Sequence, residues 1–219
     1  MHVRLKVCCI ASRAEAEMAI AAGADALGLV AQMPSGPGPI SDGEISEIAA
    51  AVPPPIATFL LTSEMTAEAI AAHVECTGVN TVQIVSHIGI DEAAKLARLC
   101  PQVRRVQVIH VEDRSALDFI AGYAPHVHAF LLDSGQPSAA VPQLGGTGRA
   151  HDWAVSAAFV EQSPRPVFLA GGLKPDNVGE AVRQVRPFGV DLCTGVRTAD
   201  RLDAGKLDAF VAALRAPQP

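Results

Sequence analysis

Short apolar runs alternate along the chain with longer segments in which alanine and other apolar residues recur at helical spacing. The short runs are rich in Val, Ile and Leu, a pattern typical of parallel strands that are buried on both faces. The pattern predicts strands at residues 3–8, 26–30, 56–61, 81–85, 104–110, 128–132, 166–169 and 189–192.

A helix is predicted after each of these strands or strand-like runs. The predicted helices begin near Arg13, Asp42, Ala67, Asp91, Arg114, Asp152, Asp176 and Asp203. Most of these starts have Ser, Thr or Asp at or beside them, and such side chains accept hydrogen bonds from the first free N–H groups of a helix. Ser12 and Glu15 have the spacing of a capping box.

Eight strands that are each followed by a helix predict an α/β fold, a closed (β/α)₈ TIM barrel, with residues 1–219 as a single domain. A doubly wound sheet usually has fewer strands in this length. It also carries a Gly-x-Gly-x-x-Gly turn after the first strand if it binds dinucleotides, and the sequence has no such turn there.

Composition narrows the classes of function. Hydrophobic residues make up 49% of the chain and charged residues 18%, which favours a large packed core over disorder. A net charge of -6 argues against non-specific binding of nucleic acid, which needs a basic face. No apolar run approaches the roughly 20 residues that span a bilayer, and the first residues lack the zones of a signal peptide. We therefore expect a cytoplasmic protein without a membrane partner.

The five cysteines are Cys8, Cys9, Cys76, Cys100 and Cys193. Their number is odd and their spacing shows no disulfide framework. In a reducing cytosol we expect them to be mostly free thiols.

Two strand-to-helix connections are longer than the others. Residues 31–41 are rich in Pro, and residues 134–151 are rich in Gly. In a barrel these connections lie at the carboxyl ends of the strands, where active sites are found. Loops of this length are usually functional or disordered, so the first is predicted to be a stiff wall and the second a lid.

An acid–base pair is predicted at the mouth of the barrel. Cys8 ends the first predicted strand and Asp133 follows the sixth. A thiolate can remove a proton from carbon and a carboxylic acid can donate one to a leaving oxygen, as an isomerase requires. The alternatives are that Cys8 is a small buried apolar residue and that Asp133 caps a turn.

A phosphate site is predicted at the last two turns. Gly171 and Gly172 follow the seventh strand, and Thr194 and Gly195 follow the eighth. Glycine lets backbone N–H groups approach an anion closely, and these two loops form the usual phosphate site of a barrel. The alternative is two ordinary glycine turns.

An ordered set of motifs extends over nearly the whole chain and resembles the phosphoribosylanthranilate isomerases. The matching segments are Lys6-Val7-Cys8-Cys9-Ile10, residues 22–28, Val82-Gln83, Leu131-Leu132-Asp133, residues 145–148 with Asp152-Trp153, residues 170–173, Asn177-Val178, and Asp191 with Gly195-Val196. No single motif is decisive, but the order of the set is that of the family.

The resemblance implies an Amadori rearrangement in tryptophan biosynthesis, which converts N-(5-phosphoribosyl)anthranilate into a 1-deoxyribulose phosphate. Asp133 would protonate the ring oxygen and Cys8 would remove the C2′ proton. The residues around the phosphate would be Gly171, Gly172, Thr194 and Gly195. Other residues expected to bind substrate are Gln83, His110, Gly146, Arg149 and Arg197. No metal or organic cofactor is implied, and the protein is expected to be a monomer or a homodimer.

Several departures from the family pattern concern the substrate. Family members usually carry an Arg in the loop after the second strand, where it can pair with the anthranilate carboxylate, whereas residues 35–40 contain no cation. Cys9 stands where the family has Gly, Val85 where it commonly has His, and Arg197 where it commonly has an acid. Either Arg149 or Arg197 could replace the missing cation, although most arginines are simply surface charges.

Other functions remain open at this stage. A homologous barrel could act on a different phosphorylated sugar-amine, or bind a sugar phosphate without catalysis. Thiols of the first strand could also lie near Cys193, with His110 and Asp133 across the mouth, and bind a soft metal such as zinc. No Cys-x-x-Cys or His-x-x-x-His spacing supports such a site. The paired thiols could equally be redox-active.

Overall fold

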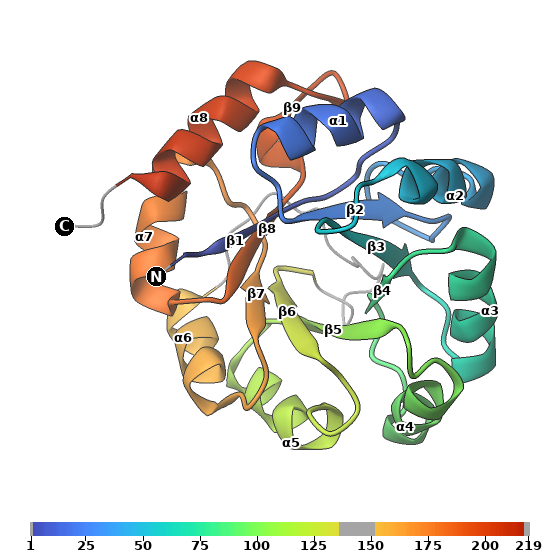
Figure 1. Ribbon diagram of the computed structural model, residues 1–219. Helices are drawn as coiled ribbons and strands as arrows, with labels where there is room; N and C mark the ends of the chain where they lie inside the picture. Colours follow the sequence, from blue (N-terminus) through green and yellow to red (C-terminus); the bar gives the residue numbers. More distant parts are fainter. Residues whose placement is uncertain (1, 136–151, 217–219) are drawn as a thin grey trace.

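The computed structural model describes residues 2–135 and 152–216, and their strands form a closed parallel barrel in the order β1 to β8 (Figure 1). The predicted fold class is therefore confirmed. The strands are β1 (Arg4–Val7), β2 (Ala26–Val30), β3 (Ala57–Thr62), β4 (Thr81–Ile84), β5 (Arg104–His110), β6 (Ala129–Asp133), β7 (Val167–Leu169) and β8 (Gly189–Leu192).

The barrel closes where the first strand pairs with the last. Arg4 is in register with Gly189 and Val7 with Leu192. Side chains alternate between the inside of the barrel and the helical layer, as strand geometry requires. The inside holds a small cluster that includes Phe59, Val108 and Phe168, and a larger cluster lies between strands and helices. The packed interior leaves the carboxyl ends of the strands as the place for a site.

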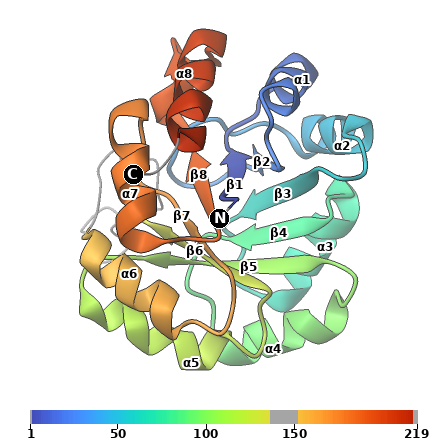
Figure 2. The ribbon, with the colours of Figure 1, turned by 60° about the vertical axis from the view of Figure 1, so that its left-hand side comes forward.

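The helices form an outer ring around the strands (Figures 1 and 2). They are α1 (Arg13–Ala21), α2 (Asp42–Ala51), α3 (Ala67–Thr77), α4 (Ile90–Leu99), α5 (Phe119–Tyr123), α6 (Trp153–Gln162), α7 (Pro175–Val185) and α8 (Ala204–Arg215). In the described part of the chain, no helix is long and apolar enough to cross a membrane.

The helix starts follow local capping. A complete capping box is present at Ser41 and Glu44, where each side chain bonds to the backbone of the other residue. The box predicted at Ser12 is only half formed. Ser12 accepts from the N–H of Glu15, but the Glu15 carboxylate accepts from Ala11 instead. Glu15 is therefore directed toward the loop after β1.

Four short elements were not predicted. The 3₁₀ helix η1 (Arg114–Asp118) precedes α5, so the α-helix there begins later than expected. The 3₁₀ turn η2 (Thr194–Val196) follows β8, and β9 (Arg197–Thr198) and β10 (Arg201–Leu202) form an antiparallel pair before α8. These elements are too short to show a hydrophobic period.

Candidate active site

A cavity with about 750 Å³ of empty space, open to solvent, lies at the carboxyl ends of the strands. Three groups of side chains that were predicted separately meet around it: the acid–base pair, the last two turns and the loop after β2. The lining residues are Cys8, Cys9, Val30, Met33, Ser35, Gly36, Pro37, Leu61, Gln83, Val85, Val108, Asp133, Ala170–Leu173 and Asp191–Gly195.

Cys8 and Asp133 both line this cavity. Cys8 follows β1 and is 5% exposed, whereas Asp133 is the last residue of β6 and is partly exposed. The Asp133 carboxylate accepts a hydrogen bond of 2.7 Å from the N–H of Ser134. A thiol and a carboxyl group from opposite parts of the barrel thus face one cavity.

A buried ion pair lies beside the thiol. Lys6 is fully buried, and its Nζ donates to Asp191 at 2.8 Å. Gly28 on the neighbouring strand makes room for it, because a Cβ there would lie 2.6 Å from the Cys8 Sγ and 3.0 Å from the Lys6 Nζ. Burial alone would lower the pKa of Lys6, but the charges of Asp191 and Cys8 outweigh it and raise that pKa. Lys6 is therefore a permanent cation next to Cys8.

Burial sets the resting protonation of the acid–base pair. It raises the pKa of Cys8 to about 11, although the Lys6 charge opposes this shift. It also raises the pKa of Asp133, against the opposing hydrogen bond from Ser134. Both shifts favour the neutral forms, and with its pKa of about 11 Cys8 is mostly a thiol near neutral pH.

The two glycine turns pack directly on each other. Gly171 and Gly172 have φ values of 83° and 64°, a left-handed conformation that exposes successive N–H groups on one side. A Cβ at Gly195 would lie 2.4 Å from the carbonyl oxygen of Leu173. Asn177 in the first turn of α7 donates to the Gly172 carbonyl at 3.0 Å and fixes the β7 turn. These turns can therefore form one cradle for an anion.

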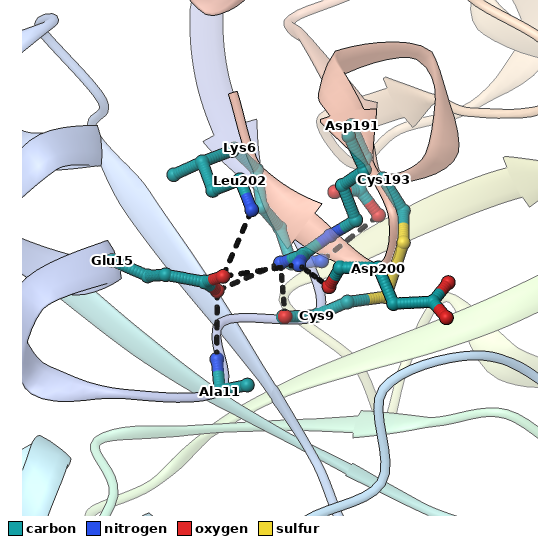
Figure 3. Close-up of a disulfide and its surroundings, with 9 residues drawn as sticks. Lys6, Cys9, Ala11, Glu15, Asp191, Cys193, Asp200 and Leu202 are labelled. Carbon is teal, nitrogen blue, oxygen red and sulfur yellow. Dashed lines mark hydrogen bonds and ion pairs between the residues drawn. A yellow bond between two sulfur atoms is a disulfide. The ribbon is translucent and has the colours of Figure 1, made fainter. Parts of the chain in front are cut away.

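A disulfide joins Cys9 and Cys193 at the edge of the cavity (Figure 3). The expectation of mostly free thiols holds for Cys8, Cys76 and Cys100 but is wrong for this pair. The proximity of a first-strand thiol to Cys193 was anticipated from the barrel, but the bond itself was not, because its partners are 184 residues apart and show no disulfide spacing. They meet because β1 and β8 are neighbours in the closed barrel, with 5.9 Å between the two Cα atoms.

Arg197 belongs to a second link between the same two loops. Its guanidinium pairs with Glu15 at 3.0 Å and donates to the carbonyl oxygens of Cys9 and Asp200. Glu15 also accepts from the N–H groups of Ala11 and Leu202 (Figure 3). Partial burial opposes the charge of Glu15, but these hydrogen bonds together lower its pKa. Arg197 does not line the cavity.

The other predicted substrate residues are placed differently. Gln83 lines the cavity, and its Oε1 is buried without a hydrogen-bond partner among the described residues. His110 ends β5, is 3% exposed and contacts the Val85 carbonyl oxygen through Nε2, without lining the cavity. Gly146 and Arg149 lie outside the described residues.

The metal hypothesis gains no support from the described residues, where no three His, Cys, Asp or Glu side chains are grouped for a metal ion. Two of the thiols that it invoked, Cys9 and Cys193, are joined to each other.

Sequence reasoning missed Lys6, Asp191 and Gly28 as parts of the site environment. A lysine within an apolar strand was the available signal, because a buried ammonium needs a partner. The partner itself could be found only after β1 and β8 were known to be neighbours.

Residues 5–213 match the protein-family model described as N-(5'phosphoribosyl)anthranilate (PRA) isomerase. Two curated relatives carry related names. The N-(5'-phosphoribosyl)anthranilate isomerase of Halobacterium salinarum is 38% identical over 221 residues, covering 99% of this chain and 98% of the relative. N-(5'-phosphoribosyl)anthranilate isomerase 2 of Methanosarcina mazei is 36% identical over 199 residues, covering 90% of this chain and 87% of the relative.

Solved structures show the same similarity. The phosphoribosyl anthranilate isomerase of Thermotoga maritima superposes with a TM-score of 0.84 at 26% identity, covering 99% of this chain and all of the other. The similarity thus extends over the entire barrel and is not limited to a phosphate-binding half.

Proposed function

Because the chain belongs to the N-(5'-phosphoribosyl)anthranilate isomerase family, we propose that it catalyses the Amadori rearrangement of N-(5-phosphoribosyl)anthranilate in tryptophan biosynthesis. The observation that supports this most directly is the meeting of Cys8 and Asp133 on one cavity, beside the glycine turns after β7 and β8. In this proposal the residues have the roles of general base, general acid and phosphate cradle.

Asp133 is the general acid of the proposed reaction. It donates its proton to the ring oxygen as the bond between that oxygen and C1′ breaks, which leaves an iminium between C1′ and the anthranilate nitrogen. The raised pKa suits this role, because burial favours the protonated form of the carboxyl group, which is the form that donates.

Cys8 is the general base that removes the C2′ proton from the iminium. The pKa of about 11 means that the thiolate is a minor form near neutral pH. The reaction proceeds from the thiolate fraction, which the Lys6 ammonium favours because an adjacent cation stabilises the charged form. The C2′ proton moves to the Cys8 Sγ, and the enolamine that remains tautomerises to the ketone product. Lys6 is thus proposed to support the base without contacting substrate.

The phosphate is proposed to bind the backbone N–H groups of Gly171, Gly172, Thr194 and Gly195. At the other end, no Arg, Lys or His of the described residues lines the cavity, so the anthranilate carboxylate has no cation there. Gln83 is proposed to bind substrate through its unpaired amide oxygen, which can accept a hydrogen bond from the anthranilate N–H. Gly146, Arg149 and His110 keep their predicted substrate roles as proposals. The guanidinium of Arg197 is engaged by Glu15.

The proposal is tested by complementation of a tryptophan auxotroph that lacks this isomerase. Growth without tryptophan is expected, and failure to grow despite a folded, well-expressed protein would contradict the function. With the purified enzyme, Cys8→Ala and Asp133→Asn should each lower kcat by about 10² to 10⁴-fold, as expected when a general base or acid is lost. Cys100→Ala is the matched control, because Cys100 is buried but lies outside the cavity.

We also propose a cytoplasmic location and a monomeric or homodimeric state. Fractionation of the cells that express the protein tests the first. Analytical ultracentrifugation distinguishes a particle of 22.7 kDa from one of twice that mass, and any larger assembly would contradict the second.

A further inference from the structure

The Cys9–Cys193 bond joins the loop of the proposed base to the proposed phosphate turn. Cys9 directly follows Cys8, Cys193 directly precedes Thr194, and both cysteines line the cavity. We propose that this pair is a thiol–disulfide modification site through which a dithiol reductant lowers the affinity of the cavity for phosphate. The inference rests on the proposed function for the identity of the substrate, but phosphate binding can be measured without it.

The bond acts on a backbone segment that is already constrained. Cys9 has φ 62°, a left-handed conformation that costs free energy for any residue with a Cβ. The loop after β2 packs against it, since a Cβ at Gly38 would lie only 2.7 Å from the Cys9 Cβ. The disulfide is thus one of the contacts that hold Cys9 in this conformation, and opening it removes that contact.

A reductant can reach the bond from the cavity. Cys9 is 4% exposed, whereas Cys193 is partly exposed. A thiolate of the dithiol attacks one sulfur and forms a mixed disulfide, while the other cysteine leaves as a thiolate and takes a proton. The second thiol of the reductant then displaces the first cysteine. Two electrons and two protons pass to the protein, and the reductant becomes a disulfide.

The ionic link between the loops remains after reduction. In the structure Glu15 bridges Arg197, Ala11 and Leu202, and Arg197 donates to the Cys9 carbonyl. Reduction breaks none of these contacts. Reduction should therefore loosen the β8 turn without separating the two loops. The ligand must then order the turn as it binds, which typically weakens binding about three- to tenfold. Since the Cys8 and Asp133 groups are unchanged, KM should rise by this factor and kcat should change less than about twofold.

The coupling must act in both directions. If reduction weakens phosphate binding, bound phosphate must disfavour reduction by the same factor. The measured quantity is the ratio of reduced to oxidised dithiol at which half of the protein is reduced. Saturating inorganic phosphate should raise this ratio about three- to tenfold.

The test uses the full-length protein equilibrated in buffers of reduced and oxidised dithiothreitol. After denaturation and alkylation, mass spectrometry should count three modified cysteines in the oxidised protein and five in the reduced protein. The Kd for inorganic phosphate is measured by calorimetry in both states, beside KM and kcat. Five free thiols in the oxidising buffer, or equal phosphate affinity in both states, would overturn the proposal.

Two variants separate this proposal from the proposed function. Cys8→Ala removes the base but should keep the redox-dependent phosphate affinity, whereas Cys193→Ser should bind phosphate like the reduced protein in every buffer. Cys76→Ser is the control, since Cys76 is exposed and outside the cavity. Loss of the redox response in Cys8→Ala would mean that the response depends on Cys8, and would contradict its assignment to the Cys9–Cys193 pair. An inactive wild-type protein that retains the response would contradict only the isomerase function.

Discussion

At the scale of single residues, burial decides how the acid and the base can work. The pKa of Cys8 is raised to about 11 and lies above the raised pKa of Asp133, yet the reaction needs the thiolate and the protonated carboxyl group together. The competent form is therefore a small fraction of the enzyme. Between the two pKa values this fraction is constant, because the gain of thiolate with pH is offset by the loss of protonated acid.

The pH profile follows from this order of pKa values. On the plateau between the two pKa values kcat/KM should vary less than about twofold, and it should fall only as the pH approaches the Cys8 pKa of about 11. Steady-state rates across this range test the expectation, with circular dichroism at each pH as a control for folding. A tenfold fall between pH 7 and pH 9 would show that the thiol ionises in that range and contradict the assignment.

Lys6 offers a second prediction at this scale. Lys6→Met removes one partner of a fully buried ion pair and leaves Asp191 as an unpaired buried carboxyl group. Breaking such a pair typically costs about 3–5 kcal/mol of unfolding free energy, which urea denaturation measures. Adding Asp191→Leu should recover part of the loss, because an apolar pair leaves no buried charge.

Lys95→Met is the matched control for this experiment. It removes a lysine from an exposed ion pair with Glu68, which solvent already screens, and should change stability little. Equal losses in the Lys6 and Lys95 variants would show that the buried charge has no special cost.

At the scale of elements, the prediction of β2, β5 and β8 was correct to the residue, because each is a short run containing Val, Ile or Leu between two segments of helical spacing. The starts of α1, α2 and α3 were also correct, since Ser or Thr caps mark them. Local pattern could not reveal the β9–β10 pair or the Cys9–Cys193 bond. Both depend on neighbours that only the closed barrel brings together.

The candidate site likewise contains residues that local sequence pattern could predict and contacts that it could not. Cys8, Asp133 and the glycine turns were found because each stands at the carboxyl end of a predicted strand, where the fold locates chemistry. The partners of Arg197 were not found, since its contacts with Glu15 and Cys9 cross 182 and 188 residues of sequence. Sequence position therefore predicts which groups reach the cavity better than it predicts what holds them there.

The contact between the last two turns carries a prediction at the element scale. Gly195→Ala introduces a Cβ that would lie 2.4 Å from the Leu173 carbonyl oxygen, so the β8 turn must shift. The phosphate Kd should rise about tenfold or more, because displaced N–H groups lose charge-assisted hydrogen bonds. Calorimetry with inorganic phosphate measures the change.

Gly205→Ala provides the comparison for this variant. In α8 the added Cβ would lie 3.5 Å from the nearest atom, the Asp203 Oδ1, which is an ordinary contact. It should leave the phosphate Kd unchanged and slightly stabilise the helix. Unchanged affinity in Gly195→Ala would mean that the β8 turn does not bind the anion.

At the scale of the whole molecule, the barrel has a seam between β1 and β8, where the first and last strands meet. Hydrogen bonds between strands close this seam along its length, and Cys9–Cys193 closes it covalently at the cavity end. Because its two cysteines are 184 residues apart in sequence, the bond restricts the conformations of nearly the whole unfolded chain. Disulfides with long loops typically contribute about 2–4 kcal/mol, chiefly by lowering the entropy of the unfolded state.

Reduction of this one bond should therefore lower Tm by roughly 5–15 °C for a chain of this size. Differential scanning calorimetry of the oxidised and reduced protein measures the shift, and Cys193→Ser should melt like the reduced protein whatever the buffer. Cys76→Ser should keep the full difference between the two states, because Cys76 takes no part in the bond. Loss of the disulfide frees the unfolded chain and must therefore lower Tm. A Tm that does not depend on reductant would contradict the expected stabilisation and would mean that the hydrogen bonds between β1 and β8 alone hold the barrel closed.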